Sequence, residues 1–97
     1  MLHATEVSFR LGPGTVEDAR GIAARLSAAA AGCRDDMLFV DEQSGTFGYL
    51  ALWDGFTEAE QFPTRPAVIE VVESLTQRLT KPPAVRQYTV ERPRENR

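Results

Sequence analysis

The sequence predicts an α+β domain of ferredoxin-like type, in which a βαββαβ chain forms one antiparallel sheet with its helices on one face. Three observations predict it. Two main segments carry apolar residues at helical spacing, four segments alternate like strands, and glycine or proline residues separate them. The chain has 97 residues, of which 42% are hydrophobic, as expected for one small globular domain. We expect this domain to span residues 1–92 and residues 93–97 to form a solvated tail.

The first third of the chain is predicted to form a strand and then a helix. Residues 4–11 alternate between apolar and polar side chains, and the Gly-Pro-Gly run at 12–14 ends the strand. Thr15 is a suitable N-cap for a helix over residues 16–31, and Asp18 follows three residues later, as in a capping box. The apolar stripe of this helix is rich in alanine, which allows close approach to a sheet. Its members are Val16, Ala19, Ala23, Leu26 and Ala30.

Two central strands are apolar on both faces. They span residues 36–42 and 46–53, and the polar residues 43–45 between them are expected to form a hairpin loop. Because side chains alternate along a strand, each strand presents one set to the helices and another set to the opposite face. The expected helix-facing set is Met37, Phe39, Phe47, Tyr49, Ala51 and Trp53, and the opposite set is Leu38, Val40, Gly48, Leu50 and Leu52.

The last third of the chain is predicted to form two helices and a strand. Thr57 and Glu60 match a capping box, which predicts a short helix ending near Phe62. Proline is tolerated in the first turn of a helix, so the next helix is expected over residues 66–79. A final strand over residues 84–91 completes the βαββαβ order.

The sheet face opposite the helices is too apolar to remain in water. A sheet that is apolar on both faces needs a cover on each side, and the predicted helices supply only one. Burial of five or six such side chains at roughly 1.5–3 kcal/mol each favours association with a second copy of the chain. We therefore expect a two-fold homodimer. The predicted interface residues are Leu38, Val40, Leu50, Leu52, Tyr88 and Val90.

Composition narrows the functional classes. The net charge of −3 and the pI of about 5.1 argue against nucleic-acid binding, which needs a basic surface. No stretch approaches the ~18 consecutive apolar residues of a membrane span. A lone cysteine, Cys33, and the lack of a signal-peptide pattern lead us to expect a cytoplasmic protein. The single histidine, His3, and the lack of Cys/His clusters predict no metal site.

A resemblance to a known family rests on residues 50–62, with sequence LALWDGFTEAEQF. An aliphatic strand that ends in Trp53, a short polar turn and a small helix with alanine and an aromatic residue resemble the antibiotic biosynthesis monooxygenase (ABM) domain family. The proline pair at 82–83 and Tyr88 also suit the pattern. The resemblance spans about the whole chain. It implies membership of the dimeric α/β-barrel superfamily, in which two protomers form one barrel and each keeps a pocket between its sheet and its helices.

The resemblance implies a choice between activities. Haem-degrading members carry Asn, Trp and His at positions that correspond to Val7, Phe62 and Val72, and none of these residues keeps the required chemistry. Haem degradation is therefore not expected. Other members form quinones without a cofactor. In those, the substrate itself donates electrons to oxygen, and the protein supplies orientation, a base and stabilisation of an oxyanion.

The candidate site follows from that chemistry. The expected pocket for an aromatic substrate is lined by Phe9, Phe39, Tyr49, Trp53 and Phe62. Trp53 and Tyr49 are the catalytic candidates, although both also suit a plain core. The candidate polar partners are His3, Arg10, Arg86 and Tyr88. Arg10 and Tyr88 also suit an interface, and Cys33 suits a half-buried filler.

Two functions stay open at this point. The first is a small cofactor-independent monooxygenase acting on an aromatic or quinol-like substrate. The alternative is a non-catalytic dimeric domain that binds a small apolar ligand or has a structural role. The number of polar groups inside the pocket distinguishes them, because an enzyme needs groups that move a proton and stabilise charge.

Overall fold

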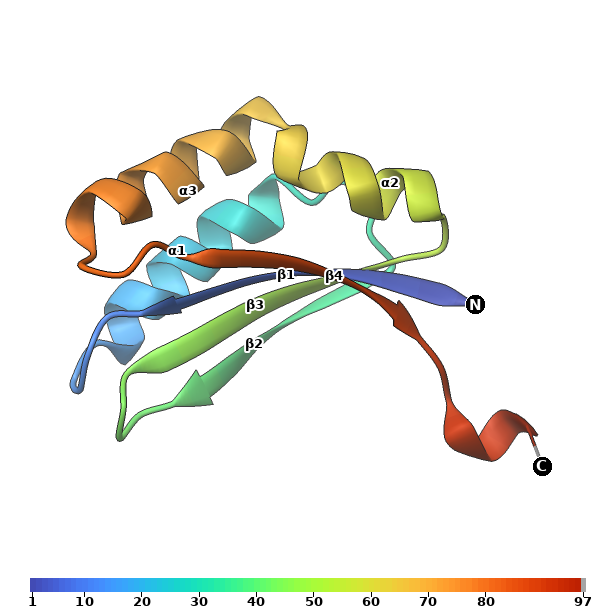
Figure 1. The fold of residues 1–97 in the computed structure, drawn as a ribbon, viewed down its shortest axis with the longest axis horizontal. Coiled ribbons are helices and arrows are strands. Elements are labelled where there is room, and N and C mark those ends of the chain that lie inside the picture. Colours follow the sequence, from blue (N-terminus) through green and yellow to red (C-terminus); the bar gives the residue numbers. More distant parts are fainter. Residues whose placement is uncertain (97) are drawn as a thin grey trace.

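The computed structural model describes residues 1–96 and has the predicted order of elements (Figure 1). The strands are β1 (Leu2–Arg10), β2 (Asp35–Asp41), β3 (Thr46–Trp53) and β4 (Ala84–Val90). The helices are α1 (Val16–Ala28), α2 (Phe56–Gln61) and α3 (Pro66–Arg78). Short 3-10 turns follow α2 (Phe62–Thr64) and β4 (Pro93–Asn96).

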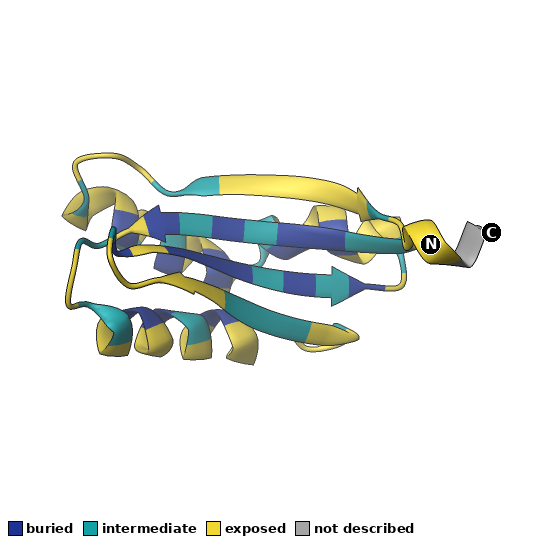
Figure 2. Cartoon of the chain, turned by 90° about the horizontal axis from the view of Figure 1, so that it is seen from below, coloured by how far each residue is buried: buried dark blue, intermediate teal, exposed yellow. Residues whose placement is uncertain are grey.

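The four strands form one antiparallel sheet in the order β2-β3-β1-β4. All three helices lie on one side of this sheet (Figure 1). Figure 2 looks onto the other side, which we call the open face, and no helix crosses in front of the strands. The ferredoxin-like α+β fold expected from the sequence is thus confirmed.

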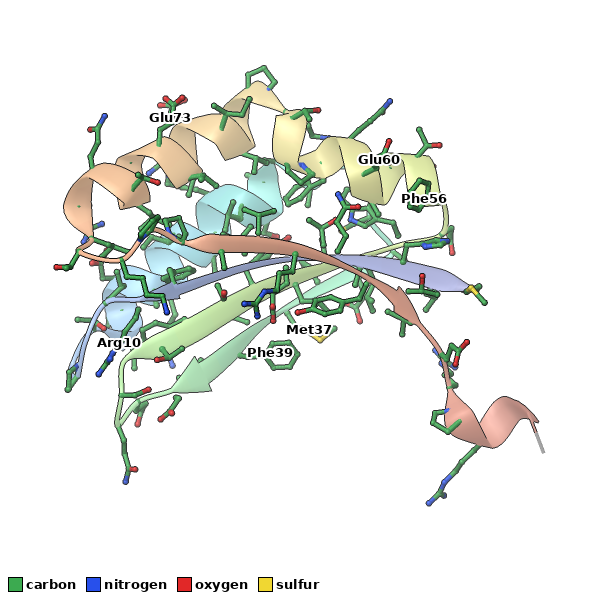
Figure 3. All side chains as sticks on the ribbon, in the orientation of Figure 1. Arg10, Met37, Phe39, Phe56, Glu60 and Glu73 are labelled. Atoms are coloured by element: carbon green, nitrogen blue, oxygen red, sulfur yellow. The ribbon has the colours of Figure 1, made fainter. Side chains whose placement is uncertain are left out.

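The register of β2 corrects one prediction. Leu38 lies opposite Tyr49 and Phe39 lies opposite Gly48. Residues that are directly opposite share a face. Leu38 and Val40 therefore face the helices, while Met37 and Phe39 project from the open face (Figure 3). The expected face of all four residues was wrong, because β2 is apolar on both sides and only its pairing with β3 decides which side faces the helices.

The core lies between the helices and the two central strands, β1 and β3. Alternate residues of β3 are fully buried against α1, α2 and α3. The hydroxyl of Thr5, also buried, donates a hydrogen bond of 2.7 Å to the carbonyl of Ala59 and thereby ties α2 to the sheet. The buried apolar residues of the helices are Ala19, Ile22, Leu26, Ala59, Val68, Val71 and Leu75.

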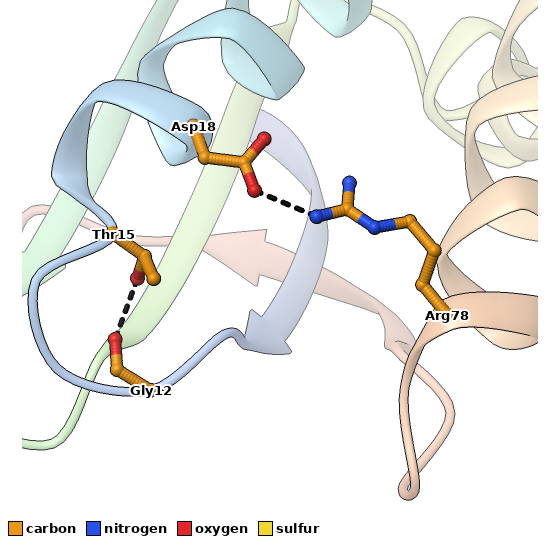
Figure 4. Close-up of polar contacts among 4 residues, drawn as sticks. All are labelled: Gly12, Thr15, Asp18 and Arg78. Carbon is orange, nitrogen blue, oxygen red and sulfur yellow. Dashed lines mark hydrogen bonds and ion pairs between the residues drawn. The ribbon is translucent and has the colours of Figure 1, made fainter.

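Helix capping differs from the prediction. The Thr15 hydroxyl donates to the carbonyl of Gly12, and Asp18 forms an ion pair of 2.7 Å with Arg78 (Figure 4). Neither side chain caps α1, because each finds a partner outside the helix. Helix α2 starts at Phe56, with Gly55 as its N-cap, so the predicted role of Thr57 was wrong.

Helix α1 ends at Ala28, three residues before the predicted end at residue 31. The amide of Ala30 donates to the carbonyl of Ser27, so the chain tightens into i→i+3 bonding at this point. Gly32 has a φ of 92°, which reverses the chain towards β2.

The predicted tail begins in the last 3-10 turn, where Pro93 and Arg94 are exposed. Arg97 and the side chains of residues 95 and 96 lie outside the described residues. Over residues 1–96, no helix has the length and apolar character needed to span a membrane.

Candidate functional site

Four of the five predicted pocket residues come together as a closed aromatic cluster, formed by Phe9, Tyr49, Trp53 and Phe62 with Phe47. The ring centroids of Trp53 and Phe62 are 5.4 Å apart, and those of Tyr49 and Phe62 are 6.3 Å apart. All five side chains are at most 4% exposed. The aromatic side chains therefore fill the space that the sequence predicted as a pocket. Phe39, the fifth predicted residue, lies on the open face and is 51% exposed.

Arg65 covers the end of this cluster. Its guanidinium carbon lies 5.0 Å from the Trp53 ring centroid and 5.8 Å from that of Phe62. The same group donates hydrogen bonds of 2.8 and 3.0 Å to the carbonyls of Ala29 and Ala31, which follow α1. Sequence reasoning missed this residue, since Arg65 lies more than 30 positions away from both carbonyls. The Trp53 Nε1 is buried and has no hydrogen-bond partner among the described residues.

The polar end of the cluster is a hydrogen-bonded triplet of Tyr49, Asp36 and Ser27. The Tyr49 hydroxyl donates to Asp36 Oδ2 at 2.8 Å, and the Ser27 hydroxyl donates to the same oxygen at 2.5 Å. Burial raises the pKa of Tyr49 well above its usual value, and the bond and negative charge of Asp36 raise it further. Tyr49 is therefore a neutral donor that orients the carboxylate.

This triplet borders a depression of about 230 Å³ between α1 and β2. Arg20 brings a cation to its rim and also pairs with Glu17. Apolar side chains form the rest of the wall, so the depression combines an apolar surface with a carboxylate, two hydroxyls and a guanidinium. The lining residues are Arg20, Ala23, Ala24, Ser27, Asp36, Met37, Leu38 and Tyr49.

The predicted polar partners do not converge on Trp53. Arg10, Arg86 and Tyr88 belong to the open face, on the other side of the sheet. The Tyr88 hydroxyl donates there to Glu6 Oε1 at 3.0 Å. His3 lies on the helix side, where its ring meets the edge of Phe56 at a centroid distance of 5.7 Å.

The predicted interface residues divide between the two faces. The structure places Leu50, Leu52, Tyr88 and Val90 on the open face, and their contact with a second copy stays a prediction. Leu38 and Val40 lie on the helix side, as the register of β2 requires.

The surroundings of Cys33 do not activate its thiol. Partial burial raises the pKa of the Cys33 thiol, and the negative charges of Asp36 and Asp35 raise it further. The residue is therefore a thiol at neutral pH and a poor nucleophile. Among the side chains that the structure describes, no group of three or more His, Cys, Asp or Glu could hold a metal ion.

Solved structures share this fold. Rv0793 from Mycobacterium tuberculosis matches with a TM-score of 0.72 and 18% identity, over 95% of this chain and 97% of that one. SnoaB from Streptomyces nogalater, a cofactor-independent oxygenase solved as a point mutant, matches with a TM-score of 0.71 and 14% identity, over 94% of each chain. A structure named antibiotic biosynthesis monooxygenase matches with a TM-score of 0.67 and 16% identity, over 95% of this chain and 100% of that one.

No protein-family model matches the sequence, and no curated protein matches it. The chain therefore has the fold of the ABM proteins, at a sequence identity that shows the fold alone. The resemblance noted from residues 50–62 is confirmed at this level, and the matches extend over nearly the whole chain.

Proposed function

We propose that this chain is a member of the ABM family and a cofactor-independent monooxygenase of phenolic or quinol-like substrates. The observation that carries the proposal is the Tyr49–Asp36–Ser27 triplet beside an apolar depression. Asp36 Oδ2 accepts both hydroxyl hydrogen bonds, and Oδ1 has no hydrogen-bond partner among the described residues. Oδ1 is thus available to accept the proton of a substrate hydroxyl.

The reaction needs only oxygen besides the substrate. Asp36 takes the phenolic proton, and the Arg20 guanidinium at the rim stabilises the phenolate. The phenolate transfers one electron to O₂, and the resulting radical and superoxide combine at the ring carbon para to the oxygen. Loss of water from the protonated peroxide removes the hydrogen of that carbon and leaves a quinone. One oxygen atom of O₂ enters the product and the other leaves as water.

The base and the depression together define the substrate class. A carboxylate is a weak base, so proton transfer is efficient only from a phenol that is acidified by a conjugated carbonyl group. A volume of about 230 Å³ is smaller than most ligand pockets, so only one ring of a polycyclic substrate would enter it. The apolar walls contributed by Ala23 and Leu38 suit the face of that ring.

We also propose that the working unit is a cytoplasmic homodimer built on the single domain of residues 1–92. The open face supports this, because Phe39 and Tyr88 are 51% and 43% exposed there. Met37, Leu50 and Leu52 lie on the same face beside them. Exposed apolar side chains that gather on one sheet face are typical of a protein–protein interface. A second copy of the chain is the simplest partner, since a two-fold axis pairs the same surface patch of two chains.

A non-catalytic ligand-binding or structural domain is the second candidate. The closed aromatic cluster favours it, because Trp53 and Phe62 are fully buried and leave no space for a substrate beneath them. Under this alternative, the depression binds a small aromatic ligand without turnover, or the fold serves assembly alone.

Oxygen consumption distinguishes the two candidates. We expect the wild-type protein to consume O₂ with naphthols and larger phenols that carry a conjugated carbonyl. Asp36→Asn should lower kcat at least about 100-fold, as removal of a general base does. Asp35→Asn is the matched control, because Asp35 lies opposite Leu52 on the open face and should keep activity.

Binding of these phenols can be followed by quenching of the fluorescence of Trp53, the only tryptophan. If the phenols quench this fluorescence and the wild-type protein consumes no O₂, the binding alternative is established. Equal activity of the Asp36 and Asp35 variants would exclude the triplet as the catalytic site.

A further inference from the structure

We propose that two protomers recognise each other through reciprocal ion pairs, in which Glu6 of each chain binds Arg86 of the other. This inference rests on the homodimer proposed above and specifies which polar groups align it. These two residues lie opposite each other on the open face, beside the apolar side chains of Leu50 and Tyr88.

Glu6 lies near the middle of the open face. It is opposite Leu50 on β3 and Arg86 on β4. Its Oε1 accepts the hydrogen bond from Tyr88, and its Oε2 lies 3.3 Å from where a Cβ on Gly48 would be. The carboxylate is thus held over the sheet by one hydroxyl, and the absence of a side chain at Gly48 leaves room for it.

Arg86 has the complementary charge and no partner for it. It is exposed, and no hydrogen bond or ion pair joins its guanidinium to another side chain that the structure describes. Although it lies directly across from Glu6, the two side chains form no ion pair within the chain, because the carboxylate turns to Tyr88 instead. Both residues line a groove of about 470 Å³ on the open face, together with Ser8, Phe39 and Gly48.

A second chain that covers this face would remove water from the Glu6 carboxylate and the Arg86 guanidinium. Removal of water from an unpaired carboxylate and an unpaired guanidinium costs several kcal/mol for each ion. A two-fold axis makes each contact between two chains occur twice. If Glu6 of one chain meets Arg86 of the other, the reverse pair forms as well, and all four charges have a partner. Within the described part of the chain, Arg86 is the cation that lies in the same groove and meets this requirement.

Arg10 is the other cation of the open face and provides a control. It belongs to the end of β1, and its Nε already donates to the carbonyl of Ser44 at 3.3 Å. It does not line the groove that holds Glu6. A charge change at Arg10 should therefore leave the alignment of the protomers unaffected.

A mixing experiment separates pairing between chains from pairing within one chain. Because Asp41 also lines the groove, Glu6→Arg leaves two cations and one carboxylate there, and Arg86→Glu leaves three carboxylates. Each variant alone should dimerise at least tenfold more weakly than the wild type in sedimentation equilibrium, since like charges oppose each other across the axis. A one-to-one mixture should form heterodimers with near wild-type affinity, and Arg10→Glu should behave as the wild type in the same assay.

Heterodimers that form preferentially from folded partners would establish the reciprocal pairs. Dimerisation of each variant alone with wild-type affinity would overturn the pairs and leave the homodimer intact. Two folded variants that stay monomeric even when mixed would also overturn them. A wild-type chain that is monomeric at 100 μM would overturn the homodimer itself, whatever the variants do.

Discussion

Both faces of the sheet carry apolar side chains, but only one face is covered by helices of the same chain. On the helix side, Thr5, Val7 and Phe9 of β1 and the alternate residues of β3 are at most 4% exposed, and helices of the same chain provide their cover. On the open face, Phe39 and Tyr88 are largely exposed beside the half-buried Leu50 and Leu52. One face is therefore closed when the chain folds, and the other is the surface on which we propose that a second chain packs.

The polar groups divide in the same way. On the helix side, Asp36 accepts two hydroxyl hydrogen bonds and belongs to a small depression. On the open face, Glu6 accepts one hydrogen bond from Tyr88, while Arg86 stands without a partner among the described residues. The first arrangement suits chemistry on a small molecule, and the second suits recognition of another charged surface.

The largest effect is expected from Trp53→Ala, which removes the centre of the helix-side core. Trp53 is fully buried against Phe62 and Arg65, so the free energy of unfolding should fall by about 3–5 kcal/mol. Chemical denaturation measures it. Leu50→Ala, on the open face of the same strand, is the matched control. An equal loss for the two variants at a concentration where the protein is monomeric would contradict the difference between the faces.

The next effect is expected from Thr5→Val, a change of similar shape that removes one hydrogen bond. The carbonyl of Ala59 then loses its donor in a buried position, which should cost about 1–3 kcal/mol of unfolding free energy. Tyr88→Phe removes the exposed hydrogen bond from Tyr88 to Glu6 on the open face and should lower the free energy of unfolding by less. Urea denaturation of both variants measures the contrast, and a larger loss for Tyr88→Phe would refute it.

A smaller effect concerns pH. Because the folded protein raises the pKa of Tyr49, the unfolded chain releases this proton first as the pH increases. The contribution to stability is complete below the usual pKa of 10.0 and is lost progressively as the pH rises above it. Tyr49→Phe should remove this part of the alkaline loss. Thermal melts between pH 8 and pH 11 measure this loss of stability. Tyr88→Phe is the control, because it leaves Tyr49 in place and should lose stability with pH as the wild type does.

The smallest effect on the stability of one chain is expected from Phe39→Ser. This side chain is 51% exposed on the open face, so the unfolding free energy of a dilute monomer should change by less than about 1 kcal/mol. Self-association should nevertheless weaken at least tenfold. Light scattering across a concentration series tests this, and unchanged association would show that the open face is not the interface.

Local signals in the sequence predict the elements well. The β3 strand has the predicted bounds, Thr46–Trp53, because a largely apolar run lies between Gly45 and the Asp54-Gly55 pair. Pro66 begins α3 as predicted, since proline fits the first turn of a helix. The order βαββαβ then leads to helices on a single face.

The predicted site was less complete. Trp53 and Tyr49 do lie together, since both alternate along one strand, but Asp36 and Arg65 reach them from distant segments. No spacing along the chain indicates these contacts. Asp36 is the first residue of the strand predicted over residues 36–42, and only its register opposite Ala51 turns it towards Tyr49.

The sequence by itself determined the element order, part of the apolar stripe of α1 and the excess of apolar surface, because periodicity and turn residues act over a few positions. Only the tertiary structure decided which side of β2 faces the helices, that the aromatic side chains fill their own space, and that Glu6 turns to Tyr88 rather than to Arg86. The physical reason is that these outcomes depend on strand register and side-chain packing between segments far apart in the chain, and a strand with two apolar sides carries no local preference between them.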